Sequence, residues 1–282
     1  MTGELPATAT SDPGGPPGGA VARLAAPALA LTALLAPASA APQAEDPVAS
    51  SPGFGNGDPV ETGWAGSVDF GFTLTEGNSE TTNFSLAALM QRRWHRWRWT
   101  TDGSYLRATT EGDETANRGG ISTQADYFPT GRFFLFVRAS ASFNQPAGLD
   151  LRLAPAAGAG YQVLAGERVQ LSVEGGGSWI RDEFTAGPAD EAVHMSVGED
   201  FAWKLAEDTN VQQSLLYEPK TGDFGDYLLT AQASLTTMIT DALGLKLSFR
   251  DEYDSDPFVD PVTGEEREQN DITFITGVTF QF

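Results

Sequence analysis

Residues 271–282, the last of the chain, read D-I-T-F-I-T-G-V-T-F-Q-F and decide the fold. The even positions carry bulk or a methyl group, and the odd positions are small or polar apart from Ile275. Because successive side chains of a strand point to opposite faces, this stretch has one apolar face and one wet face. A tilted strand that crosses a bilayer needs about ten residues. The segment therefore predicts a membrane-crossing β-strand.

The same alternation occurs at Trp64–Thr75, where the even positions are mostly apolar and the odd positions are small or polar. Residues 76–79 then read E-G-N-S, residue types that tolerate the positive φ angles of a turn. We expect an all-β fold, a transmembrane antiparallel up-and-down β-barrel of about twelve strands. The remaining strands are predicted at about 82–92, 96–107, 119–128, 132–143, 152–163, 168–180, 192–203, 209–217, 226–238 and 243–253.

The lengths of the connections predict the orientation of the barrel. Outer-membrane barrels have short periplasmic turns and longer extracellular loops. We therefore expect the N- and C-termini in the periplasm and the barrel in the bacterial outer membrane. The short connections are predicted at 93–95, 129–131, 165–167, 205–208 and 239–241, and the longer ones at 108–118, 144–151, 181–191, 218–225 and 254–270.

The alternative fold is a soluble β-sandwich or a lipocalin-like barrel, in which apolar side chains point inward. The small and polar face of the predicted strands could not fill such a core. A closed barrel with its bulky side chains outward leaves no unpaired backbone edge in lipid. This interpretation requires that Phe70, Leu245 and Phe280 do not meet in a dry core.

The N-terminal region predicts export. Arg23 precedes an apolar run at 24–36, and A-S-A follows at 38–40, which is the pattern of a secretory signal peptide. We expect a signal peptide at 1–40, a flexible periplasmic tail at 41–63 and a barrel at 64–282. The net charge of −21 argues against a nucleic-acid partner, and the absence of cysteine excludes disulfides and thiolate metal sites.

Aromatic residues gather where the predicted strands end. Amphipathic rings favour the headgroup level of a bilayer, so we expect two aromatic belts. The predicted belt residues are Trp64, Trp94, Trp97, Trp203 and Phe282 at the periplasmic end, and Tyr105, Trp179, Tyr217 and Tyr253 at the outer end.

Charged residues of both signs are predicted to point into the lumen. Their acidic excess favours cations, although the mixed signs exclude strong selectivity. The sequence leaves open whether the lumen is a narrow passive pore or the plugged interior of a structural or adhesion protein. The predicted lumen charges are Asp69, Asp126, Arg132, Arg138, Glu174, Asp226, Lys246, Arg250 and Glu252.

A lipid-modifying enzyme is the third alternative, because His194 and Ser196 share one face of a predicted strand. Residues two positions apart in a strand lie roughly 7 Å from one another, whereas a catalytic hydrogen bond spans about 3 Å. The nucleophile motif G-x-S-x-G is also absent. We therefore expect no catalytic residues, and no motif indicates a metal or a cofactor.

Several motifs resemble a family of salt-induced outer-membrane proteins, the YdiY-like family. They are W-A-G-S at 64–67 with T-E-G-N-S at 75–79, the Arg92-Arg93 pair with Trp97, A-G-A-G-Y at 157–161 before G-G-G at 175–177, and Pro257 before Asn270-Asp271. The resemblance covers 64–282 and implies an integral outer-membrane barrel, a link to salt or osmotic conditions, and no catalytic residues.

The final residue, Phe282, completes an ending that resembles the C-terminal signal of outer-membrane barrels. This resemblance implies the barrel-assembly machinery as a partner. Outer-membrane lipids and lipopolysaccharide are the other expected partners, the latter through divalent ions held by acidic outer loops. We expect a monomer.

Overall fold

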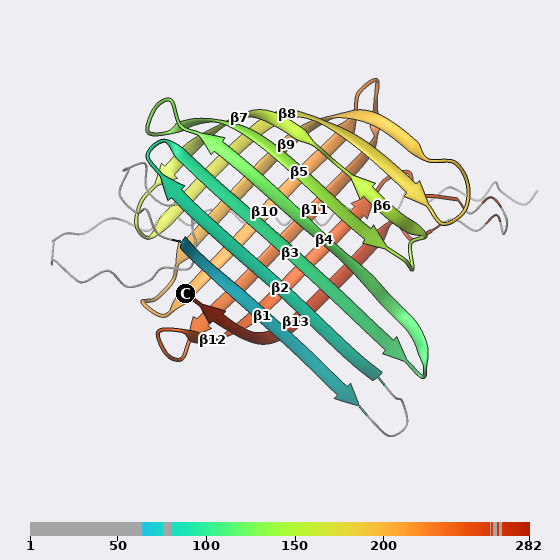
Figure 1. The fold of residues 1–282 in the computed structure, drawn as a ribbon, viewed down its shortest axis with the longest axis horizontal. Helices are drawn as coiled ribbons and strands as arrows, with labels where there is room; N and C mark the ends of the chain where they lie inside the picture. The colour runs from blue at the N-terminus through green and yellow to red at the C-terminus, as the bar shows by residue number, and fades with distance from the viewer. Residues whose placement is uncertain (1–63, 76–80, 260, 262–263, 265–266) are drawn as a thin grey trace, which may run out of the picture. The chain divides into compact units, whose positions relative to one another are not determined.

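The computed structural model describes residues 64–75, 81–259, 261, 264 and 267–282, so the predicted signal peptide and tail lie outside the described residues. No helix in this part of the chain is long and apolar enough to cross a membrane. The described chain is built from strands (Figure 1), namely β1 (Trp64–Thr75), β2 (Thr81–Trp94), β3 (Trp97–Thr110), β4 (Asp113–Tyr127), β5 (Phe133–Asn144), β6 (Leu149–Leu153), β7 (Ala156–Ala165), β8 (Val169–Phe184), β9 (Asp190–Lys204), β10 (Thr209–Lys220), β11 (Asp223–Met238), β12 (Leu243–Asp254) and β13 (Asn270–Gln281).

The strands form one closed antiparallel barrel, as predicted. Successive strands pair with each other, except that β6 and β7 each pair with β5 and β8 and not with one another, and β1 pairs with β13 to close the wall. The closure continues at Phe282, which exchanges backbone hydrogen bonds of 3.0 and 3.1 Å with Gly66. Strands β6 and β7 together occupy one place in the wall, because Pro155 between them has no N–H to donate to the ladder. The barrel therefore has twelve strand positions.

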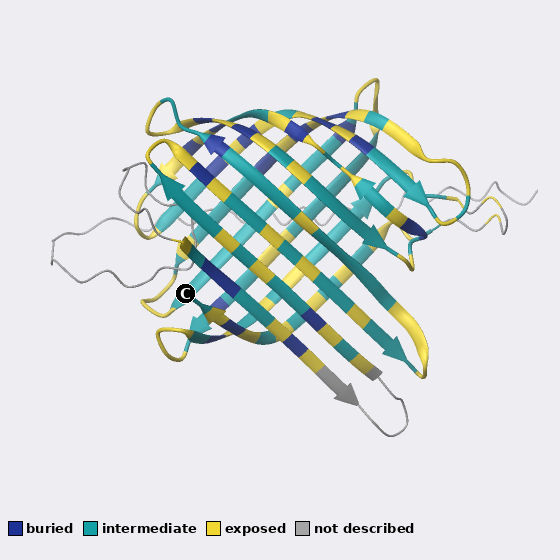
Figure 2. Ribbon diagram, in the orientation of Figure 1, coloured by how far each residue is buried: buried dark blue, intermediate teal, exposed yellow. Residues whose placement is uncertain are grey.

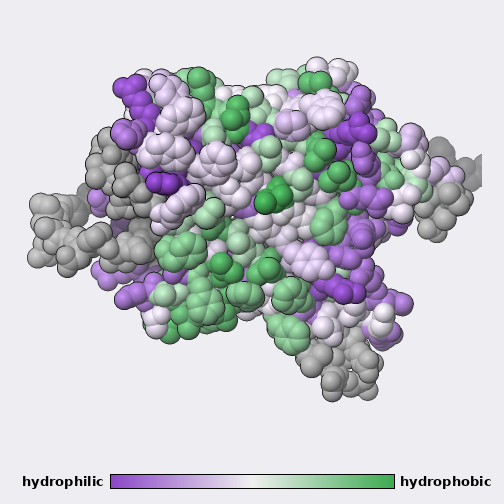
Figure 3. Space-filling model, in the orientation of Figure 1, coloured by the Kyte–Doolittle hydropathy of each residue, from purple (hydrophilic) through white to green (hydrophobic). Residues whose placement is uncertain are grey.

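Bulky apolar side chains point outward, as the alternation predicts. Along β13 exposed and less exposed residues alternate, and Phe274 is 67% exposed. Phe70, Leu245 and Phe280 are all about half exposed, so they do not meet in a dry core. The same alternation is visible along β1 to β3 in Figure 2. In Figure 3 green apolar groups lie over the wall of the barrel, and hydrophilic groups gather toward its ends.

The predicted long connections are mostly wrong. The loop predicted at 108–118 is the two-residue turn Glu111-Gly112, and the loop predicted at 218–225 is the two-residue connection 221–222. Glu111 and Gly112 have φ angles of 54° and 89°, which suit a tight hairpin turn. The strands continue beyond their apolar part, where polar side chains stand on both faces and the alternation is lost. Only the connection between β12 and β13, at 255–269, is long among those that link described strands.

We name the two ends of the barrel by their connections. The turn end carries Trp64 and Phe282 and the connections 95–96, 128–132, 166–168, 205–208 and 239–242. The loop end is opposite and carries the β12–β13 connection.

Candidate functional site in the barrel lumen

The structure places most of the predicted lumen charges in ion pairs inside the barrel. Asp69 of β1 binds Lys246 of β12 at 2.6 Å, and Arg250 binds Glu252 at 2.7 Å. Near the loop end Asp226 binds Lys220 at 2.8 Å. The remaining predicted residues Asp126, Arg138 and Glu174 join a cluster near the turn end, whereas Arg132 lies exposed in the bend between β4 and β5.

A cluster of arginine and phenylalanine side chains fills part of the lumen near the turn end. Arg98 of β3 is 2% exposed, donates to Asp126 of β4 at 2.6 Å, and has its guanidinium over the rings of Phe128 and Phe134. Phe134 of β5 is 1% exposed. Stacking of a planar guanidinium on aromatic faces stabilises its charge away from bulk water.

Polar contacts extend this cluster across the interior to β8 and β9. Arg138 of β5 binds Glu174 of β8 at 2.7 Å and lies 3.4 Å from the hydroxyl of Ser196 on β9. Gln124 of β4 donates to Asp126 at 2.8 Å. The cluster therefore links strands from β3 to β9 and narrows the lumen on this side.

Two glycines on β7 make room for the phenylalanines. Gly160 pairs with Phe134, and Gly158 pairs with Phe136. A Cβ atom added at Gly160 would lie within 2.7 Å of the Phe134 ring, so only glycine fits beside this ring.

This cluster of arginine and phenylalanine was not predicted from the sequence, although β5 carries a signal for it. Phe134 and Phe136 point inward, while Leu135 and Val137 point outward and are exposed. Bulk on both faces of a strand indicates that the interior is filled at that height.

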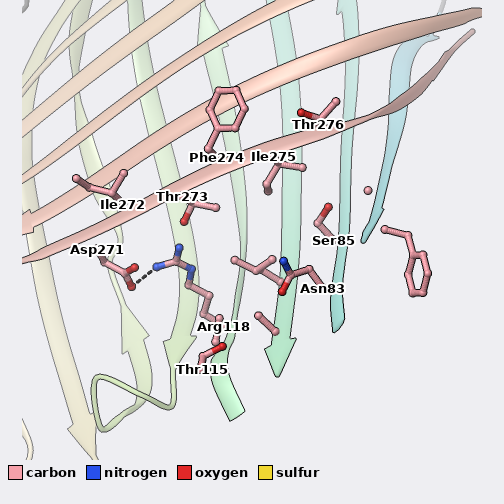
Figure 4. Close-up of a pocket in the computed structure, with 15 residues that line it drawn as sticks. Asn83, Ser85, Thr115, Arg118, Asp271, Ile272, Thr273, Phe274, Ile275 and Thr276 are labelled. Carbon is pink, nitrogen blue, oxygen red and sulfur yellow. Dashed lines mark ion pairs between the residues drawn. The ribbon is translucent and has the colours of Figure 1, made fainter. Parts of the chain in front are cut away.

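A second polar bridge crosses the lumen nearer the loop end. Arg118 of β4 forms an ion pair with Asp271 of β13, although four strand steps separate β4 from β13 in the wall. Asn144 of β5 also donates to Asp271, at 2.8 Å. Beside this bridge is a cavity of about 270 Å³ (Figure 4), whose polar lining includes Asn83, Ser85, Thr115 and Thr273.

The predicted belt residues lie near the two ends of the barrel wall. Trp64, Trp97, Trp203 and Phe282 are exposed near the turn end. Near the loop end Trp179 is exposed, Tyr105 packs against Phe84 and Phe143, and Tyr217, Tyr227 and Tyr253 form a chain of ring contacts. Trp94 ends β2 and has Arg92 over its ring. Three further aromatic residues lie beside the predicted belt residues and were not predicted, namely Trp99, Tyr127 and Tyr227.

The side chains of His194 and Ser196 do not form a catalytic pair. A ring nitrogen of His194 lies 3.1 Å from the backbone oxygen of Glu218, and the Ser196 hydroxyl lies near Arg138. A serine hydrolase needs a hydrogen bond between the two side chains themselves.

Nearly the whole described barrel corresponds to a known protein family. A family model described as "Protein of unknown function, DUF481" matches residues 68–282. The chain belongs to this family. A curated relative, "Uncharacterized protein YdiY" of Escherichia coli (strain K12), is 21% identical over 194 residues, which cover 68% of this chain and 75% of the relative. The resemblance drawn from the motifs is therefore confirmed.

Solved structures of other membrane proteins are similar at low identity. The NanC porin is 11% identical with a TM-score of 0.47, over 77% of this chain and 100% of that chain. The translocator domain of the autotransporter NalP from Neisseria meningitidis is 11% identical with a TM-score of 0.43, over 78% of this chain and 87% of that chain. The strand pairing, rather than these likenesses, establishes the closed barrel.

Proposed function

We propose that the protein is an integral β-barrel of the bacterial outer membrane and serves as a narrow passive pore that prefers small cations. Its outward bulk suits lipid, and its inward charges suit a water-filled path. The turn end would face the periplasm.

The bridge between Arg118 and Asp271 carries the proposal of a narrow pore. Arg118 of β4, together with Asn144 of β5, reaches Asp271 of β13 across the lumen, so a wide channel cannot pass this level while the bridge is closed. Acidic groups supply the cation preference. Asp102 and Asp200 lie on inward positions of β3 and β9 and have no cationic partner within 4.0 Å among the described residues.

Conductance of the purified barrel in planar bilayers tests the proposal. We expect small, cation-preferring current steps from the wild type and larger steps from Arg118→Ala, because the substitution removes the ion pair with Asp271 and leaves only the shorter Asn144 side chain on that carboxylate. Arg107→Ala is the matched control, since Arg107 lies in the same hairpin, is exposed and pairs with Glu114. Its steps should equal those of the wild type.

A non-conducting structural protein is the second candidate, favoured by the cluster around Arg98 and Phe134 near the turn end. If neither the wild type nor Arg118→Ala conducts, the pore proposal is wrong and the structural role stands. The family resemblance adds the proposal of a role under changed osmolarity. Equal growth of a deletion strain and its complemented parent at low and high osmolarity would contradict that role.

A further inference from the structure

A carboxylate on β9 points out of the barrel wall. Glu199 is paired directly opposite Val173 of β8 and Leu215 of β10, which are exposed apolar residues. Directly opposite residues project from the same face of a sheet, so Glu199 is also on the outer face. No hydrogen bond or ion pair involves its side chain within the described chain. An ionisable group on a lipid-facing surface is unfavourable and marks a functional contact.

Residues that are paired directly opposite one another lie progressively nearer the loop end on successive strands, from β5 to β13. With strands about 4.8 Å apart and tilted by about 40°, one step from a strand to the next rises about 3 Å. The row of paired residues that contains Glu199 shows the direction of this rise, because it begins at the turn end of β5 and finishes near the loop end of β13. From β5 to β13 the row is Phe133, Tyr161, Val173, Glu199, Leu215, Ala231, Asp251 and Ile272.

Glu199 lies at mid-depth in the apolar band. Trp203 is four residues nearer the turn end of the same strand, which places it about 10 Å lower at about 3.4 Å per residue and a 40° tilt. Tyr217 is opposite Val197 on the next strand, about 8 Å higher by the same geometry. The apolar band of such barrels is about 25 Å tall, so Glu199 is within it.

A hydrogen-bond donor lies beside this carboxylate at nearly the same depth. Gln213 of β10 is opposite the outward-facing Phe201, diagonal to Glu199. Gln213 lies two residues nearer the turn end than Leu215, the residue opposite Glu199, and this lowers it by about 5 Å. The step from β9 to β10 raises it by about 3 Å, so Gln213 lies only about 2 Å below Glu199. Within the described chain its side chain, like that of Glu199, has no hydrogen-bond partner.

We propose that this face of the barrel binds a second copy of the same chain across a two-fold axis along the membrane normal. Such an axis preserves depth and exchanges the two positions, so the Gln213 amide of each copy donates to the Glu199 carboxylate of the other. Both polar groups are then satisfied in a medium that contains no water. This proposal differs from the monomer expected from the sequence.

The same symmetry brings two apolar residues to the axis. The two pairs Glu199–Leu215 and Phe201–Gln213 form a group of four outward-facing neighbours on β9 and β10. Glu199 and Gln213 lie on one diagonal of this group, and Leu215 and Phe201 lie on the other. Leu215 is almost directly above Phe201, so each of these two residues faces its own counterpart in the second copy. The neighbouring strands β8 and β11 carry the small outward-facing residues Gly175 and Ala231 next to this group, and these let the two barrel walls approach closely.

Disulfide cross-linking in membranes tests the dimer, because the natural chain contains no cysteine. Leu215→Cys and, separately, Phe201→Cys should each give a covalent dimer upon mild oxidation. Leu247→Cys is the matched control, since Leu247 is an outward-facing leucine of β12 on another part of the wall. Its dimer yield should be at least tenfold lower.

Substitutions of the polar pair in the Leu215→Cys background test the hydrogen bonds. Glu199→Leu and Gln213→Leu should each lower the dimer yield several-fold. The exchange Glu199→Gln with Gln213→Glu keeps one donor and one acceptor in each contact and should restore the yield. Migration of unheated samples as folded barrels shows that each variant is assembled.

Two results of the cross-linking experiments would overturn the dimer. Dimer yields of Leu215→Cys no higher than those of Leu247→Cys, or yields unchanged by Glu199→Leu, would show that lipid or another molecule covers this face. The result does not depend on conductance, so the dimer and the pore can fail separately.

Discussion

Neutralising Glu174 should destabilise the barrel far more than neutralising an acid near the loop end. In Glu174→Gln the guanidinium of Arg138 keeps its charge but loses a partner at 2.7 Å, and the side chains of Glu174 and Arg138 are only 7% and 16% exposed. Removal of one member of a buried ion pair costs about 3–5 kcal/mol. The adjacent Gln124 and Ser196 still offer oxygen atoms to Arg138, so we expect a loss of about 2–3 kcal/mol in the free energy of unfolding.

Equilibrium unfolding in urea, followed by tryptophan fluorescence in lipid vesicles, measures this loss. Glu183→Gln is the matched control, because Glu183 pairs with Arg181 at 3.0 Å but both side chains are more than two-fifths exposed. Exposed pairs contribute below about 1 kcal/mol. Adding Arg138→Met to Glu174→Gln should recover part of the loss, since it removes the unpaired charge. Equal losses from Glu174→Gln and Glu183→Gln would refute the buried ion pair.

Two further substitutions test the packing and the membrane face. Gly160→Ala should cost about 1–3 kcal/mol of unfolding free energy because its Cβ overlaps the Phe134 ring, whereas Gly177→Ala, with no atom closer than 3.6 Å, should change it by less than about 0.5 kcal/mol; equal effects in urea unfolding would show that the lumen is loosely packed. Leu247→Arg puts a charge on the outer face of β12 and should cost about 2–4 kcal/mol, while Ser248→Arg on the lumen face should cost much less. The reverse order would mean that the two faces have been interchanged.

The side to which a residue points was predictable from the sequence wherever the two faces differ in chemistry. Residues of β13 alternate so regularly that even the exceptional Ile275 keeps its inward place. The prediction failed where both faces of a strand carry side chains of the same kind, either all bulky or all polar. In β5 both faces are bulky, which concealed Phe134, and beyond the apolar band both faces are polar, which made continuing strands resemble loops.

Partners across the lumen could not be predicted, because alternation fixes the direction of a side chain and not its height. Height depends on strand tilt and on the accumulated shift of register around the wall. Lys246 meets Asp69, 177 residues away in sequence, because β1 closes against β13 in a particular register. A two-residue slip in that closure would keep every side chain on its proper face and yet separate Lys246 from Asp69. The lumen contacts therefore depend on the closing register, and the backbone bonds between Gly66 and Phe282 are part of what holds it.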